Sequence, residues 1–173
     1  MDPRPGCTRS APVTKIERDK ATLHAELCAH LEQALAQARA AHAAAVEGAF
    51  HPEAKAENDK DTRGLEQLYL ARGQAQRVVE LEAALADVAA MELPSFTKRD
   101  KVLRGALVQL GEDDIVRWYF IAPGGGGTEL ASGVQVITPV SPLGRALLGK
   151  QIGDSVELRV GTKVRDLELL DVA

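Results

Sequence analysis

Two long runs of apolar residues at helical spacing dominate the first half of the chain. From Ile16 to Ala41, and again from Leu65 to Val88, apolar side chains recur every three or four positions. That spacing places them on one narrow face of a helix, as in the seam of a coiled coil. The first run comprises Ile16, Leu23, Leu27, Leu31, Ala34, Leu35, Ala38 and Ala41, and the second Leu65, Leu68, Ala71, Ala75, Val78, Leu81, Leu85 and Val88.

The runs predict two helices of about 30 residues, each about 45 Å long. Thr14 followed by Glu17 has the form of a capping box and predicts the start of the first helix. Gly48 can end that helix, and Pro52 suits the first turn of the next. Because the connection is short, we expect an antiparallel coiled-coil hairpin. Alanine in its seam makes it thin enough to enter a narrow opening.

The second half of the chain has the shorter apolar alternation that is typical of strands. Ser141 is a predicted N-cap, Pro142 a first helical residue and Gly149 the end of one short helix. We therefore predict an α+β fold, in which the hairpin precedes a small antiparallel sheet domain with one short helix. The expected strands cover residues 103–110, 116–122, 133–137, 156–160 and 164–172.

A change of composition near Pro94 marks the domain boundary. We expect the hairpin to cover residues 13–91, a linker 92–100 and the sheet domain 101–173. Residues 1–12 hold three prolines and no apolar core of a signal peptide, so we expect a disordered arm.

The composition excludes several functional classes. The 173 residues carry a net charge of −4, which is not typical of a nucleic-acid binder. No apolar run is long enough to span a bilayer, so we expect no membrane contact. Cys7 and Cys28 form neither a disulfide framework nor a zinc motif. Reduced thiols and the missing signal favour the cytoplasm.

Carboxylates crowd the connection between the predicted helices. The acids there are Glu53, Glu57, Asp59 and Asp61. Their oxygens suit a hard cation such as Mg²⁺, which takes one or two carboxylates together with water and other ligands. Acidic residues are also common in the first turn of a helix, where they favour the helix dipole. From the residues alone, this structural explanation is the more common one.

Other motifs indicate no catalytic site. The loop Gly124–Gly127 lacks the Lys-Ser/Thr of a phosphate-binding loop, and we interpret it as a flexible hairpin loop. The four histidines form no metal-binding pair with a third ligand in sight. Ser132 and Ser141 lack the surroundings of a nucleophile.

The segment from Val136 to Lys150, followed by Gly153-Asp154, resembles the C-terminal signature of the GreA/GreB family of bacterial transcription elongation factors. The family pattern runs Ser-Pro, any residue, Ala or Gly, Arg or Lys, Ala or Gly, Leu, Ile or Leu, and Gly-Lys, before an acidic or glycine turn and a strand. Glu57-Asn58 is similar to the family's Glu-Asn at the hairpin tip. The resemblance covers most of the chain and is strongest after Gly133.

The resemblance implies an FKBP-like C-terminal domain that docks on bacterial RNA polymerase. The residues that match the signature, and that would belong to the docking surface, are Ser141, Pro142, Arg145 and Lys150. The hairpin would reach through the secondary channel, with Glu57 and Glu53 directed at the catalytic Mg²⁺ and Asp59 and Asp61 as further tip acids.

The resemblance also implies that this metal belongs to the polymerase, whose own cleavage of backtracked RNA is stimulated. The chain would then be no enzyme by itself and hold no cofactor of its own. We expect a monomer that contacts nascent RNA only indirectly.

Two questions stay open at the tip. When Glu57-Asn58 is aligned with the family pattern, its second acid falls on Ala54, one residue after Glu53, so the partner of Glu57 is undecided. The output is undecided too, because some homologues with additional tip acids inhibit polymerase. Two alternatives of other classes are an FKBP-like prolyl isomerase using the aromatic run Trp118–Phe120, and a coiled-coil adaptor that dimerises through its leucine stripe.

Overall fold

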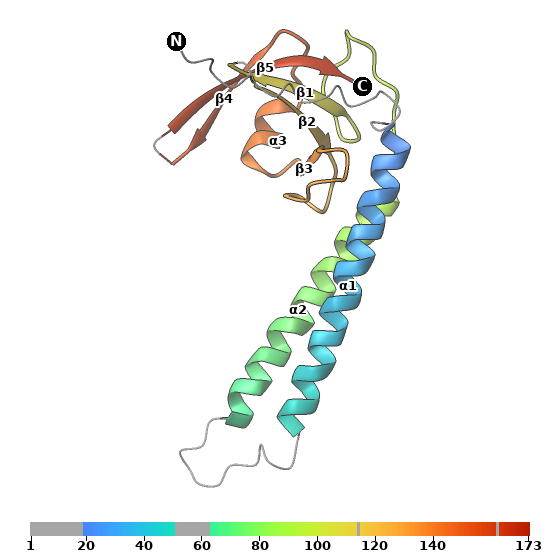
Figure 1. The fold of residues 1–173 in the computed structure, drawn as a ribbon, viewed down its shortest axis with the longest axis vertical. Coiled ribbons are helices and arrows are strands. Elements are labelled where there is room, and N and C mark those ends of the chain that lie inside the picture. The colour runs from blue at the N-terminus through green and yellow to red at the C-terminus, as the bar shows by residue number, and fades with distance from the viewer. Residues whose placement is uncertain (1–18, 51–62, 114, 162) are drawn as a thin grey trace, which may run out of the picture.

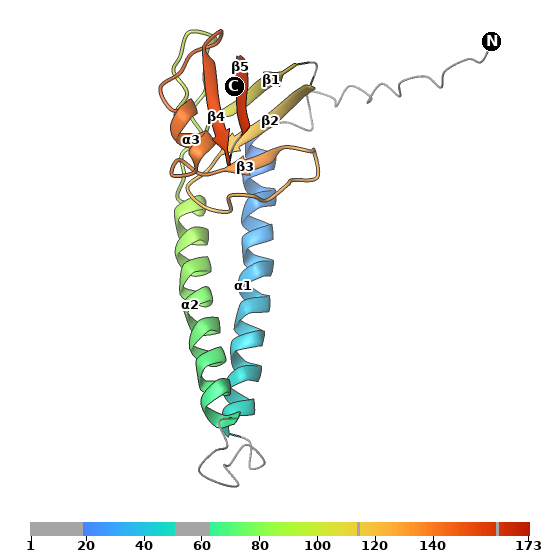
Figure 2. The ribbon, with the colours of Figure 1, turned by 90° about the vertical axis from the view of Figure 1, so that its left-hand side faces the viewer.

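A helical hairpin projects from a small sheet domain in the computed structural model, which describes residues 19–50, 63–113, 115–161 and 163–173. Helices α1 (Lys20–Phe50) and α2 (Arg63–Ala89) run antiparallel, side by side (Figure 1). A view from the side shows the same pairing, with the sheet domain at one end of the hairpin (Figure 2). The predicted order of a helical hairpin followed by a sheet domain is confirmed. The predicted N-terminal arm lies outside the described residues.

Helix α1 begins at Lys20, later in the chain than predicted. Asp19 precedes it and caps it: its Oδ2 accepts a hydrogen bond from the backbone N–H of Thr22 at 3.2 Å, and its carbonyl accepts one from Leu23 at 3.0 Å. An aspartate satisfies the free N–H groups of a first turn as well as a threonine does. The capping box at Thr14 therefore does not start α1, and Thr14 itself lies outside the described residues.

The seam of the hairpin is buried along most of its length. Its buried side chains are Leu23, Leu27, Leu31, Leu35, Ala38 and Ala45 from α1, and Ala71, Leu81 and Val88 from α2. The predicted seam residues Leu65 and Leu68 are instead 54% and 50% exposed. Ala45 and Ala71 form the seam nearest to them, and a methyl group is too small to cover a neighbouring leucine. Ala41, also predicted in the seam, is exposed.

Five strands form one sheet in the order β3-β2-β1-β5-β4. The elements are β1 (Leu107–Glu112), β2 (Ile115–Ile121), β3 (Gln135–Ile137), helix α3 (Pro142–Leu147), β4 (Ser155–Val160) and β5 (Lys163–Val172). All five predicted strands and the short helix occur in the predicted order. Strand β1 starts later than expected because the chain turns at Gly105, whose φ is 80°.

The sheet is mixed, whereas the sequence predicted an antiparallel one. Strands β2 and β3 are parallel, and the other neighbouring pairs are antiparallel. Parallel strands need a crossover connection, which residues 122–134 supply. This connection also pairs with the outer edge of β3: the N–H of Val136 donates to the carbonyl of Thr128 at 2.8 Å.

The two faces of the sheet bury two different cores. On one face, Leu107, Phe120 and Val136 join Leu23 and Leu27 of the hairpin in one buried cluster. The other face is covered by α3, and its buried side chains are Val108, Leu110, Tyr119, Ile121, Leu147, Val156, Leu158, Leu167 and Leu169. The root of the hairpin therefore shares a core with the sheet domain. Among the described residues, no helix is long and apolar enough to cross a membrane.

Candidate functional site

The predicted tip acids Glu53, Glu57, Asp59 and Asp61 all lie outside the described residues. The structure places the helix ends that flank them, Phe50 of α1 and Arg63 of α2. Helices of 31 and 27 residues measure about 46 and 40 Å at 1.5 Å per residue. The flanking ends therefore lie about 40 Å along the hairpin from its root, and the predicted tip site remains a prediction.

The root of the hairpin is held to the sheet domain by the glycine loop that follows β2. A Cβ atom built on Gly125 would lie 2.6 Å from Cδ1 of Leu27, and one on Gly124 would lie 3.0 Å from Cβ of Ala84. Gly125 also has a φ of 73°, a backbone region that glycine enters most readily. Gly124 and Gly125 thus pack against both helices. The loop is a contact pad for the hairpin and not simply a flexible turn.

Polar contacts reinforce the same junction. A carboxylate oxygen of Glu26 on α1 accepts a hydrogen bond from the backbone N–H of Ala131. The ammonium group of Lys20 donates to the carbonyl of Pro94 and lies 4.7 Å from the ring centroid of Phe96. The first turns of α1 are therefore bound both to the crossover connection and to the segment between α2 and β1. Such fixation sets the direction in which the hairpin points.

Several residues of the signature segment around α3 have a structural role within that segment. The hydroxyl of Ser141 donates to the carbonyl of Thr138 at 2.8 Å and accepts from the N–H of Gly144 at 3.1 Å, which confirms it as the N-cap. A Cβ atom on Gly144 would lie only 2.0 Å from the Thr138 carbonyl oxygen. Gly149 ends the turn after α3 with a φ of 82°. These residue types are therefore needed to fold the segment.

The other predicted docking residues are placed differently. Pro142 and Arg145 are exposed on α3. The Nε of Arg145 donates to the carbonyl of Val140 at 2.8 Å, which holds the side chain along the surface. Lys150 is partly buried, and its carbonyl accepts from the N–H of Val102 at 2.9 Å. Exposure makes Pro142 and Arg145 available to a partner, whereas Ser141 is engaged by its cap.

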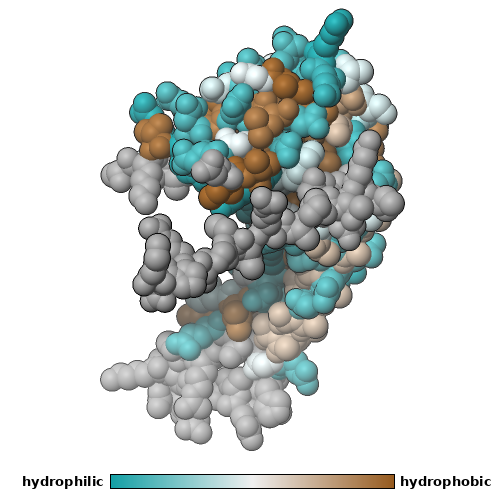
Figure 3. Space-filling view, turned by 45° about the horizontal axis from the view of Figure 1, so that its top comes forward, coloured by the Kyte–Doolittle hydropathy of each residue, from teal (hydrophilic) through white to brown (hydrophobic). Residues whose placement is uncertain are grey.

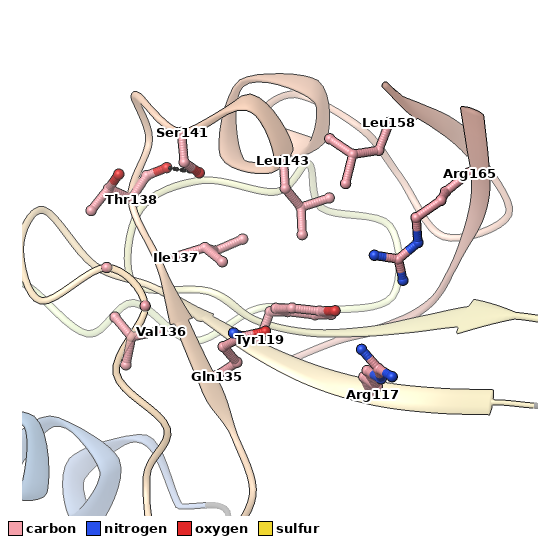
Figure 4. Close-up of a pocket in the computed structure, with 12 residues that line it drawn as sticks. Arg117, Tyr119, Gln135, Val136, Ile137, Thr138, Ser141, Leu143, Leu158 and Arg165 are labelled. Carbon is pink, nitrogen blue, oxygen red and sulfur yellow. Dashed lines mark hydrogen bonds between the residues drawn. The ribbon is translucent and has the colours of Figure 1, made fainter. Parts of the chain in front are cut away.

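A concave cavity of about 580 Å³ opens beside α3, on the sheet face that does not meet the hairpin. Its wall consists of residues from β2, β3, β4 and β5, from the crossover connection, from α3 and from the segment that leads into α3 (Figure 4). The lining residues are Arg117, Tyr119, Gly126, Gly127, Gln135, Val136, Ile137, Thr138, Ser141, Leu143, Leu158 and Arg165. Sequence reasoning missed Arg117 and Arg165 as a pair, although the i, i+2 spacing of Arg117 and Tyr119 on one strand predicts a common face.

An ion pair stands behind one of these arginines. The Nε of Arg165 donates to Oε1 of Glu112 at 2.6 Å, and its Nη2 donates to Oε2 of the same carboxylate. The hydrogen bonds from Arg165 lower the pKa of Glu112, and the positive charge of Arg117 lowers it further. The Arg165 side chain is therefore anchored, while Arg117 contributes a charge from the neighbouring part of the sheet.

The aromatic run in β2 does not form one pocket. Tyr119 lines the cavity and is 4% exposed, whereas Phe120 is buried in the core that the sheet shares with the hairpin. Trp118 packs against that same core. Alternation along the strand thus sends neighbouring aromatics to opposite faces. Tyr119 is therefore the one residue of this run that lines the cavity, and the run Trp118–Phe120 does not form the aromatic pocket that a prolyl isomerase would use.

Several large apolar side chains of the sheet domain are exposed to solvent. In the view of Figure 3, hydrophobic side chains gather on the sheet domain among hydrophilic ones. The half-exposed or more exposed apolar side chains of this domain are Leu103, Ile115, Val116, Val140 and Val164. Within the described ranges, no three His, Cys, Asp or Glu side chains are grouped so that they could hold a metal ion.

Comparisons with known proteins agree on one family. Residues 98–173 match the family described as Transcription elongation factor, GreA/GreB, C-term. Transcription elongation factor GreA of Chlorobium limicola is 30% identical over 100 residues, which are 56% of this chain and 60% of that protein. The chain thus spans about three fifths of the length of this relative.

Solved structures of related factors are also similar to the chain. GreA factor homolog 1 (Gfh1) of Thermus thermophilus is 19% identical, with 84% of this chain and 94% of that chain covered and a TM-score of 0.38. A GreA/GreB factor of Nitrosomonas europaea is 19% identical, with 62% and 92% covered and a TM-score of 0.35.

Proposed function

The chain belongs to the GreA/GreB family of transcription elongation factors, and from this premise we propose that it acts on bacterial RNA polymerase in the cytoplasm. The sheet domain docks on the polymerase, with Pro142, Arg145 and Lys150 in the contact surface. The hairpin enters the secondary channel and brings its acidic tip to the active site. There the tip stimulates cleavage of backtracked RNA by the polymerase itself, so the chain is a helper in trans and not an enzyme.

The observation that carries this proposal is the anchored, thin hairpin. Its seam narrows from leucines at the root to Ala38, Ala45 and Ala71 further out, and smaller seam residues let helices approach more closely. Arg39 of α1 donates to Glu82 of α2 at 2.6 Å across the pair. An object about 40 Å long with a fixed root can deliver side chains at its end to a buried site.

The tip acids fit the chemistry of the site that they would reach. Glu53, Glu57, Asp59 and Asp61 offer only oxygen ligands, which suit Mg²⁺. Glu57 and one further acid, Glu53 in the simplest case, would contact the metal of the polymerase and orient the attacking water. The bound metal supplies the activation of that water in phosphodiester hydrolysis. The carboxylates contribute charge and position, and the RNA phosphate stays with the polymerase.

Transcript cleavage in backtracked elongation complexes tests the proposal directly. We expect the purified chain to accelerate RNA shortening and Glu57→Ala to abolish the acceleration. Glu32→Ala is the matched control, because it removes one exposed carboxylate of α1 that lies in the half of the hairpin nearer to the sheet domain. Glu53→Ala compared with Asp61→Ala identifies the partner of Glu57. No acceleration at saturating factor would refute the cleavage activity, and equal loss in the Glu32 control would refute the special role of the tip.

The additional tip acids favour inhibition as a second candidate function. Asp59 and Asp61 add charge beyond the family's pair, and Ala54 stands where the second acid aligns. An over-acidic tip would hold the metal in an unproductive position and slow nucleotide addition. In that case Asp59→Asn and Asp61→Asn relieve the slowing. Elongation rates that do not change with factor concentration would eliminate this candidate.

A coiled-coil adaptor is less well supported by the geometry. The leucine stripe of α1 is satisfied within the hairpin, where Leu23 and Leu27 are fully buried against α2 and the sheet domain. Because these leucines are already buried within the chain, they offer no apolar surface for a coiled-coil contact with a second copy. Light scattering is therefore expected to give the mass of a monomer, and a dimer that dissociates on mutation of Leu65 and Leu68 would contradict this expectation.

A further inference from the structure

One edge of the five-stranded sheet is open. At the opposite edge the crossover connection covers β3, because the N–H of Val136 donates to Thr128 and its carbonyl accepts from Gly127. Strand β4 forms the other edge and lies on the side of the sheet domain away from the hairpin (Figure 1). Among the described residues, only β5 forms main-chain hydrogen bonds with β4. An unpaired edge of this kind is a template for another strand.

The ladder between β4 and β5 decides which main-chain groups face the open edge. The N–H of Leu169 donates to the carbonyl of Asp154 at 3.0 Å, and the pairing continues from there to the turn without a shift of register. Because hydrogen-bonded pairs alternate with non-bonded pairs in an antiparallel ladder, the even-numbered residues of β4 bond to β5. The N–H and C=O groups of Ser155, Glu157 and Arg159 therefore point outward, away from β5.

Strand β4 has few of the features that usually protect an edge strand. Its register is continuous, so no bulge twists the strand away from a partner. The side chains on its inner face, Val156 and Leu158, are apolar and buried, and no proline interrupts it. Its charges are Glu157 and Arg159, both exposed on the other face. They would repel a second strand if they had one sign, but their signs are opposite.

Neither charge of β4 is balanced by the described part of the chain. Glu157 lies directly opposite Asp166 of β5, and Arg159 lies opposite Val164. Like charges in direct opposition across two strands are destabilising. No ion pair between described residues includes Glu157 or Arg159. A strand that brought a cation beside Glu157 and a carboxylate beside Arg159 would therefore be stabilised by both contacts.

The β4 strand of a second copy supplies both charges in one register. Only the odd-numbered residues can bond across the open edge, so the two-fold axis of an antiparallel pair passes through a residue and not between two. An axis at Leu158 places Glu157 opposite Arg159 of the second copy, and the symmetry repeats this contact. An axis at Glu157 or at Arg159 places like charges opposite each other. An axis at Val156 leaves Arg159 beyond the end of the partner strand.

We propose that β4 is a self-association surface, through which two copies of the chain pair antiparallel about Leu158 and join their sheets into one. Each pair of Glu157 with Arg159 exchanges both main-chain hydrogen bonds and brings the two side chains together. A single short strand buries much less surface than the about 1,200 Å² of a stable complex. The dimer is therefore weak, with an expected Kd of about 0.1 mM, and the chain stays mostly monomeric at about 10 µM. The surface goes beyond the proposed function, because it involves neither the hairpin tip nor polymerase.

Sedimentation equilibrium and amide hydrogen exchange of the full-length chain test this surface. We expect the average mass to rise toward that of a dimer between about 10 µM and about 1 mM. Over the same range the amide hydrogens of Glu157 and Arg159 should exchange at least about threefold more slowly, because most copies are then paired. Those of the hairpin helices should not change. A constant mass, or unchanged exchange at Glu157 and Arg159, would overturn the proposal.

Charge reversal shows whether the register is the proposed one. Glu157→Arg and Arg159→Glu each place like charges opposite each other in a dimer of that variant, and should weaken association at least about tenfold. In an equimolar mixture the arginines of one variant face the glutamates of the other, so association should return to the wild-type level. Glu32→Arg is the control, because it makes the same change of charge at an exposed position of α1, and it should associate like the wild type.

The mixture also controls for loss of structure. Glu157 and Arg159 are both exposed, and a variant that did not fold could not restore association with its counterpart. Single variants that associate like the wild type, or a mixture no stronger than either variant alone, would overturn the proposal. Association that persists in both variants and is lost when Leu65 and Leu68 are replaced would also overturn it, since the contact would then lie on the hairpin. None of these experiments contains polymerase, so their outcome and that of the transcript-cleavage assay are independent.

Discussion

Replacing Gly125 by alanine tests whether the glycine loop presses against the hairpin. The new Cβ would lie 2.6 Å from Cδ1 of Leu27, closer than carbon atoms pack, on a backbone with a φ of 73°. The left-handed backbone costs about 1–2 kcal/mol for a residue other than glycine, and an overpacked core costs about 1–3 kcal/mol. We therefore expect Gly125→Ala to lower the free energy of unfolding by about 3 kcal/mol.

Gly127 provides the matched control within the same loop. Its φ is 89°, and a Cβ atom there would meet nothing within 4 Å. Gly127→Ala therefore carries only the backbone term of about 1–2 kcal/mol. The difference between the two variants, about 1–3 kcal/mol, isolates the contact with Leu27. Urea unfolding followed by circular dichroism measures both losses under one set of conditions.

A double-mutant cycle identifies the partner of the clash. Leu27→Ala alone should lower the free energy of unfolding by about 2–5 kcal/mol, because it leaves a cavity in the shared core. In the double variant the space left by Leu27 accommodates the new methyl group. Its loss of unfolding free energy should therefore be smaller than the sum of the two single-variant losses, by about 1 kcal/mol or more. Equal losses for Gly125→Ala and Gly127→Ala, or strict additivity with Leu27→Ala, would refute the reasoning.

Two further changes probe the sheet domain. Arg165 lowers the pKa of Glu112 in the folded chain, so this pair stabilises the fold above the ordinary carboxyl pKa, and the stabilisation is lost as the pH falls. Between about pH 6 and pH 3 the wild type should therefore lose more unfolding free energy, measured by urea titration, than Glu112→Gln. Parallel curves for the two proteins would contradict the pairing. Ser141→Ala should lower the free energy of unfolding by about 1 kcal/mol through loss of the N-cap. Ser141→Asp should keep most of the wild-type stability, because aspartate also caps helices. Urea denaturation measures both variants.

Local patterns accounted for most of the elements. Apolar spacing predicted both helices, alternation predicted five strands, and Ser141, Pro142 and Gly149 predicted the bounds of α3 to within about two residues. These signals succeed because a helical stripe, a cap or a turn depends on residues only a few positions apart. The start of α1 was missed because aspartate and threonine are both good N-caps, and the hydrogen bonds that Asp19 accepts from Thr22 and Leu23 identify it as the cap.

The candidate site was predictable only in part. The capping role of Ser141 follows from its own neighbours, but the cavity requires Arg117 on β2 and Arg165 on β5 to face the same hollow. They are brought together because β2 and β5 both pair with β1, where Leu110 lies opposite Arg117 on one side and Leu169 on the other. A register shift between Gln109 and Leu110 changes the pairing of β1 with β5, and no local sequence pattern predicts it.

The sequence by itself determined that the chain has a long helical hairpin with an acidic connection and a strand-rich second half, because periodicity and capping are local properties. Only the tertiary structure decided that β3 runs parallel to β2, that the glycine loop packs on Leu27, and that two arginines meet beside α3. Each of these depends on contacts between residues far apart in the chain, where the free energy of packing, and not the preference of any one residue, selects the partner.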